Sequence, residues 1–94
     1  MYATIRSYSG NTDLADALVE RESDIRQVIG TIGGFRAYHV VRGADGETTT
    51  ISVFDDQSGA EESNTAAAAY IRDNMADMSI STPQVTAGEV VLSF

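Results

Sequence analysis

The stretch FRAYHVVRGADGETTTISVF, residues 35–54, decides the fold. Polarity alternates along both of its halves with the two-residue period that is typical of β-strands. Between the halves, residues 43–46 include two glycines and an aspartate, which favour a tight turn. The stretch therefore predicts a β-hairpin with strands at residues 35–42 and 47–54.

Outward from the hairpin, each side carries one helical pattern and one further strand pattern. Residues 2–9 predict the first strand, residues 13–29 the first helix, and residues 85–94 the last strand. The second helix is expected to run from just after Asp56 to about Met78, with Ser58 and Glu61 spaced as a capping box. Six elements in the order βαββαβ over residues 1–94 predict a single α+β domain.

Composition limits the range of partners. The chain has 14 acidic residues against six basic ones, a net charge of -8 and no cysteine. Such a charge disfavours binding to nucleic acid or to anionic membrane surfaces, and without cysteine neither a disulfide nor a thiolate site can form. We expect a soluble, cytoplasmic protein, because no leader-like or membrane-spanning segment is evident. The acidity fits either an ordinary acidic protein or a halophilic one adapted to a salty cytoplasm.

Polar residues interrupt the apolar faces at a few positions. Arg21 falls inside the apolar stripe of the first helix, and Asn64 falls inside that of the second. His39 shares a strand face with Ala37 and Val41, the face that we expect to lie under the helices. The three polar side chains are therefore candidates for a common layer between helices and sheet, provided that the strand register is as predicted.

This layer has two interpretations. Its polar groups can be structural hydrogen-bonding residues, or they can line a small-molecule cleft. In a cleft, His39 would act as base or hydrogen-bond donor, Arg21 would stabilise an anionic oxygen, and Asn64 would orient the substrate. The candidate substrate-binding walls are Phe35, Ile71 and Glu89.

The other face of the predicted sheet has no helix left to cover it. Its arginines and tyrosines suit a protein interface, so a homodimer through this face is expected. The residues expected there are Thr4, Arg6, Tyr8, Arg36, Tyr38, Val40, Thr50, Ser52 and Phe54. The alternative is a sheet face that is simply solvated. No metal or cofactor site is predicted, because the chain has one histidine and no phosphate-binding loop.

Three segments resemble one known family, the antibiotic biosynthesis monooxygenase-like proteins of the dimeric α+β barrel superfamily. The segments are Gly34-Phe35-Arg36-Ala37-Tyr38, Ser52-Val53-Phe54-Asp55-Asp56 and Ala60-Glu61-Glu62-Ser63. The resemblance implies a ferredoxin-like monomer with an antiparallel four-stranded sheet and two helices on one face, paired sheet to sheet in a dimeric α+β barrel. It also implies a ligand cleft between the helices and the sheet.

The same resemblance suggests an activity. Characterised members oxygenate phenolic substrates without metal or flavin, isomerise lactones or degrade haem. The haem-degrading branch resembles this chain least, because that branch uses a tryptophan and a helix-borne histidine, whereas this chain has no tryptophan and its only histidine, His39, lies on a predicted strand. The leading hypothesis is a cofactor-independent monooxygenase-like enzyme for an aromatic or enolisable metabolite. The alternative is a non-catalytic ligand-binding or dimerisation module, which a filled helix-sheet space would favour.

Overall fold

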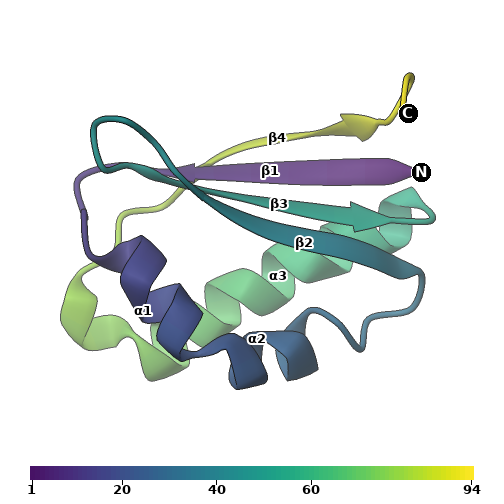
Figure 1. Ribbon diagram of the computed structural model, residues 1–94. Coiled ribbons are helices and arrows are strands. Elements are labelled where there is room, and N and C mark those ends of the chain that lie inside the picture. Colours follow the sequence, from purple (N-terminus) through teal and green to yellow (C-terminus); the bar gives the residue numbers. More distant parts are fainter.

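Four antiparallel strands form one sheet in the order β2-β3-β1-β4 in the computed structural model, which describes residues 1–94. The strands are β1 (Tyr2–Tyr8), β2 (Phe35–Arg42), β3 (Thr48–Phe54) and β4 (Gln84–Glu89). All helices lie on one face of this sheet, and the other face is open (Figure 1). The predicted ferredoxin-like α+β architecture and its central hairpin are confirmed. No helix combines the length and apolar character that crossing a bilayer requires.

The first predicted helix is two short helices. They are α1 (Leu14–Glu20) and α2 (Glu22–Val28), and the prediction of one continuous helix over residues 13–29 is wrong. The break is at Arg21, whose φ of -103° and ψ of 22° are not helical and whose backbone N–H donates to the carbonyls of both Ala17 and Leu18. The chain therefore changes direction at the one charged residue of the predicted apolar stripe.

The second predicted helix is α3 (Gln57–Asn74). It is capped by Asp56 and is followed by a short 3-10 turn, η1 (Ala76–Met78). The carboxylate of Asp56 accepts hydrogen bonds from the Gly59 N–H at 3.1 Å and from the Ser58 hydroxyl at 2.9 Å. These bonds lower the pKa of Asp56. The predicted capping box of Ser58 and Glu61 is wrong, because an aspartate one position before the helix already supplies the acceptor for its first free N–H groups.

The last strand ends earlier than predicted. Glu89 pairs with Tyr2, and the Val90 N–H then donates to the carbonyl of Met1. Beyond this point β1 offers no further residue for pairing, so the predicted strand over residues 85–94 stops at Glu89. The two chain ends consequently lie near the same end of the sheet (Figure 1).

The predicted assignment of the two sheet faces is wrong. Cross-strand register places Arg6 opposite Thr50 on one face and Ile5 opposite Ile51 on the other. The buried face that lies under the helices carries Thr4, Arg6, Tyr8, Thr48, Thr50, Ser52 and Phe54. The residues of the opposite alternation, including Ala37 and Val41 that were predicted to lie under the helices, are on the open face. They are half-buried or exposed, and the apolar ones are Ala3, Ile5, Ala37, Val41, Ile51 and Val53.

Phe35 is the exception among the residues predicted to face the helices. A register irregularity between Phe35 and Ala37 places Phe35 opposite Phe54, on the helix side, while Ala37 pairs with Val53 on the open side. The two phenyl rings meet edge to face with centroids 5.8 Å apart. This bulge explains why Phe35 and Tyr38 share a face although they are three residues apart.

The physical reason for the reversed faces is that the helix side of the sheet and α3 satisfy each other's polar groups. Ser63 and Ala60 of α3 are fully buried against the sheet, and Asn64 and Ser63 hydrogen-bond to Arg6 of β1. Small and polar residues on both surfaces allow the close approach, and the buried side-chain polar groups other than the Thr48 hydroxyl are paired. Hydrophobicity alone therefore selects the wrong face.

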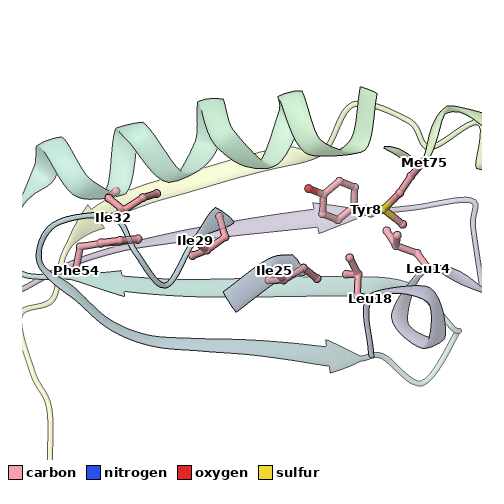
Figure 2. Close-up of a cluster of buried hydrophobic side chains, with 9 residues drawn as sticks. Tyr8, Leu14, Leu18, Ile25, Ile29, Ile32, Phe54 and Met75 are labelled. Atoms are coloured by element: carbon pink, nitrogen blue, oxygen red, sulfur yellow. The ribbon is translucent and has the colours of Figure 1, made fainter. Parts of the chain in front are cut away.

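The apolar core lies toward the ends of this layer and under α1 and α2. Figure 2 shows it between the helices and the sheet. Its nine buried members are Tyr8, Leu14, Leu18, Ile25, Ile29, Ile32, Phe54, Ala60 and Met75.

Candidate functional site

A pocket of about 570 Å³ opens between α1, α2 and the edge strand β2. It forms there because α3 packs on the two central strands, β1 and β3, and leaves the shorter α1 and α2 to cover the edge strand. Eight of its twelve lining residues are hydrophobic, and they include the aromatic residues Phe35 and Tyr38. The complete lining is Leu18, Val19, Glu22, Ile25, Arg26, Ile29, Gly30, Phe35, Ala37, Tyr38, His39 and Val40.

A second, much smaller cavity of about 30 Å³ lies behind this pocket, under α3. We call it the inner cavity. The pocket and the inner cavity share four lining residues, Leu18, Ile25, Ile29 and Tyr38. The inner cavity is also lined by polar groups of the sheet, namely Arg6, Tyr8 and Thr50. The site therefore has two parts. The pocket at the sheet edge is mainly apolar, and the inner cavity over the sheet centre is its polar end.

Arg6 dominates the polar end. Its side chain is 2% exposed and donates hydrogen bonds only to neutral acceptors. Nε donates to Thr50 Oγ1 at 3.0 Å, and Nη2 donates to Ser52 Oγ at 2.7 Å. Nη1 donates to Asn64 Oδ1 at 2.8 Å and to Ser63 Oγ at 3.4 Å. A full positive charge is therefore held in place between the sheet and α3 without a carboxylate.

Two tyrosines share the surroundings of this cation. Burial raises the pKa of Tyr8 and of Tyr38, and the nearby positive charge of Arg6 acts in the opposite direction on both. Both phenols are therefore protonated at neutral pH. Burial also lowers the pKa of Arg6, but arginine keeps its proton in proteins at neutral pH.

The three predicted catalytic residues do not meet. Asn64 lies in the layer between helices and sheet as expected, where Oδ1 accepts from Arg6 and from Thr4 Oγ1 at 2.9 Å. His39 is exposed and pairs with Ile51 on the open face, so its predicted place in that layer is wrong, although the residue contributes to the pocket rim. The cause is the reversal of the sheet faces.

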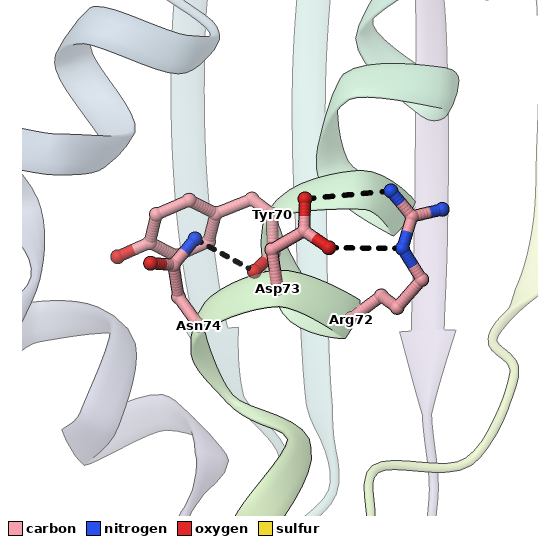
Figure 3. A network of polar contacts seen from close by, with 4 residues as sticks. All are labelled: Tyr70, Arg72, Asp73 and Asn74. Carbon is pink, nitrogen blue, oxygen red and sulfur yellow. Dashed lines mark hydrogen bonds and ion pairs between the residues drawn. The ribbon is translucent and has the colours of Figure 1, made fainter.

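Arg21 lies at the junction of α1 and α2, away from both other residues. Its Nη1 donates to the Tyr70 hydroxyl of α3 at 3.5 Å, and that hydroxyl donates to Asp24 at 2.8 Å. The bond to Tyr70 raises the pKa of Arg21. Figure 3 shows the Tyr70 ring leaving α3 in a different direction from Arg72, which pairs with Asp73 at the protein surface. Arg21 thus joins α1 and α2 to α3.

The predicted substrate-binding residues also lie in separate places. Phe35 lines the pocket and Ile71 lines the inner cavity. Glu89 is exposed near the end of β4. Its register puts it on the helix side with Tyr2, but β4 is an edge strand whose residues are mostly exposed.

The predicted dimer surface needs a larger correction. Arg6 and Tyr8 are buried under the helices, and Tyr38 lines the pocket, so these three residues cannot meet a second copy across the open face. Arg36 is exposed and forms an ion pair with Asp55. The open face is instead formed by the apolar residues that alternate with these three along the same strands.

Arg6, Tyr8 and Tyr38 are the site residues that sequence reasoning missed. A signal for them was present in α3, where Ala60, Ser63 and Asn64 are spaced for one small and polar face. Such a face fits threonines, serines and an arginine better than isoleucines. No group of three or more histidine, aspartate or glutamate side chains is close enough to hold a metal ion.

The fold is shared with solved structures of several small proteins. A candidate antibiotic biosynthesis monooxygenase from Nitrosomonas europaea superposes with a TM-score of 0.72 at 19% identity, over 98% of this chain and all of that one. The haem degrader MhuD from Mycobacterium tuberculosis, solved with two haems in its active site, gives 0.72 at 15% identity, over 100% and 99%.

A candidate antibiotic biosynthesis monooxygenase from Deinococcus radiodurans gives a TM-score of 0.67 at 16% identity, over 100% and 96% of the two chains. No family model matches the sequence, and no curated protein matches it. The chain therefore has the antibiotic biosynthesis monooxygenase-like fold, and the predicted resemblance is confirmed at the level of the fold.

Proposed function

We propose that this protein is a small-molecule enzyme that oxygenates an aromatic or enolisable metabolite in the pocket between α1, α2 and β2. The observation that carries the proposal is the pocket itself. Its volume of about 570 Å³ is in the usual range for ligand sites, and its wall is mainly apolar with two aromatic rings. A helix-sheet space filled by side chains would have favoured a purely structural module.

The chemistry proposed for the pocket needs dioxygen as the second substrate. A CH₂ group that is conjugated with a ketone through an aromatic ring loses a proton to form an enolate, which donates electrons to O₂. A carbon–oxygen bond forms, the O–O bond then breaks, one oxygen atom stays as a new carbonyl and the other leaves as water. The protein's part is to bind the ring, exclude bulk water and stabilise the enolate.

Oxygen uptake with anthrone-type and quinol-type compounds tests this proposal. We expect the protein to accelerate uptake with at least one of these compounds, and Val40→Trp, which fills the pocket, to return the rate to that without protein. Val85→Trp is the matched control, because Val85 is half-exposed on the far edge strand β4. Uptake that Val40→Trp leaves unchanged, or no uptake with any compound, would contradict the proposal.

Haem degradation is not part of the proposal. The only histidine, His39, is exposed on β2, and no histidine lies between the helices and the sheet. The donors at the polar end are an arginine and phenols. The catalytic roles suggested for His39, Arg21 and Asn64 stay predictions.

We also propose that two copies pair through the open face of the sheet. No helix covers this face, and Ile5, Ile51 and Val53 form a half-exposed apolar surface across β1 and β3. A second copy would bury the same surface on both partners.

Light scattering in solution tests the pairing. We expect twice the chain mass for the wild type and the mass of one chain for Ile51→Lys, because a lysine at the centre of the face places two buried charges in the interface. Thr65→Lys adds the same charge on the exposed surface of α3 and should remain a dimer. A monomeric wild type, or a dimeric Ile51→Lys variant, would reject this interface.

A further inference from the structure

We propose that Arg6 is a catalytic residue that binds a negatively charged ligand oxygen, so that the ligand of this site is an aromatic phenolate or enolate. The inference rests on the proposed function for the location of the ring, which lies in the pocket. It adds the charge of the ligand and the group that recognises it.

The hydrogen bonds of Arg6 to serine, threonine and asparagine side chains leave one of its donors for another acceptor. A guanidinium has five N–H donors, one on Nε and two on each Nη. Arg6 makes four hydrogen bonds to other side chains, of which only the bond to Ser52 uses Nη2. Five donors less four bonds leaves one N–H, on Nη2. The neutral phenols of Tyr8 and Tyr38 lie within hydrogen-bonding reach of Arg6, and a ligand oxyanion would be a stronger acceptor for this N–H than either phenol.

The charge of Arg6 is also uncompensated. Arg26, Arg36, Arg42 and Arg72 each form an ion pair with a carboxylate, although all four are largely exposed. Arg6 is the arginine that is buried, and it takes part in none of these pairs. A buried charge without a counter-charge is costly, and an anionic ligand would offset that cost.

The size of the inner cavity limits how much of a ligand can reach Arg6. The inner cavity is small, about 30 Å³ against about 570 Å³ for the pocket, so it accommodates the oxygen end of a ligand whose ring lies in the pocket. Leu18, Ile25 and Tyr38 line both spaces, so the pocket and the inner cavity adjoin, and the proposal places the ring in the first and its oxygen in the second. The geometry therefore favours a phenolate or enolate.

Tyr8 and Tyr38 reinforce this preference. Both line the inner cavity, and burial keeps both phenols protonated. A protonated phenol can donate a hydrogen bond to an oxyanion, as the remaining guanidinium N–H can. No aspartate or glutamate lines the inner cavity to compete for these donors.

Binding of 4-nitrophenol tests the proposal, because the absorption of the bound molecule reports whether it is phenol or phenolate. An opposite charge within hydrogen-bonding reach lowers a pKa by about 1–3 units, so the phenolate should bind about tenfold or more tightly than the phenol. Arg6→Gln should abolish this preference. Arg72→Gln, which removes the same charge from the surface of α3, should retain it.

A second variant tests the proposal independently, in case Arg6→Gln folds poorly. Asn64→Asp keeps the oxygen that accepts from Arg6 and Thr4 but places a carboxylate 2.8 Å from Arg6, so it should also abolish the phenolate preference. A wild type that binds no 4-nitrophenol, or binds both forms equally, would overturn the proposal. So would a phenolate preference that survives Asn64→Asp. Arg6-dependent phenolate binding without oxygen uptake would reject the oxygenase and leave the anion site standing.

Discussion

Phe54→Ala should lower the free energy of unfolding by about 3–5 kcal/mol, the usual cost of emptying a buried phenylalanine site. Phe54 has no exposed surface, and its ring packs against Phe35. The ring also lies so close to Gly59 of α3 that a methyl group on that glycine would be 2.9 Å from it. Because small domains are stable by only about 5–15 kcal/mol, the loss is a large fraction of the total.

Urea unfolding followed by circular dichroism measures this loss at a fixed protein concentration. Phe94→Ala is the control, because the same substitution at this fully exposed residue removes no buried contact. The comparison also tests which face of the sheet the helices cover. A loss for Phe54→Ala as small as that for Phe94→Ala would place Phe54 on the open face and refute the architecture described above.

Asn64→Ala should cost about 1.5–3 kcal/mol of stability, the range for a hydrogen bond to a charged group. The amide oxygen accepts from Arg6 and from Thr4, and both donors lie in the buried layer. Removing the acceptor leaves part of the buried guanidinium unpaired.

Thermal and urea unfolding of two further variants complete this test. Asn74→Ala removes an exposed amide of α3 that donates to the Tyr70 carbonyl, and its effect should be small. Asn64→Asp should recover most of the stability, since its carboxylate accepts the same two bonds. If Asn64→Ala were as stable as the wild type, the residue would have no role in holding Arg6, and a direct contact with substrate would be its better explanation.

The phenolate and oxygen experiments test different parts of the site. The polar end needs only Arg6 and its neighbours, whereas oxygenation also needs the ring to be held in the pocket. Phe35 and Val40 belong to the pocket alone, and Tyr38 belongs to both spaces. Variants at Val40 and at Arg6 therefore separate loss of ring binding from loss of oxyanion binding.

The sequence by itself determined the order of elements, the hairpin at residues 43–46 and the single α+β domain. These features depend on local periodicity and on turn-forming residues, which act over a few neighbours along the chain. Gly46 shows this clearly, because its φ of 86° is the conformation that its turn requires and that glycine adopts without strain. The helical character of residues 14–28 was also predicted, but the break at Arg21 was not.

Only the tertiary structure decided which face of the sheet lies under the helices, and hence which residues form the site. Both faces of β1 alternate regularly, with Ala3 and Ile5 on one side and Thr4, Arg6 and Tyr8 on the other. Periodicity identifies two faces but does not say which one meets the helices when each has a reason to be buried. That choice depends on hydrogen bonds between residues about 60 positions apart, such as Arg6 with Asn64, and these bonds form only when α3 packs on the sheet.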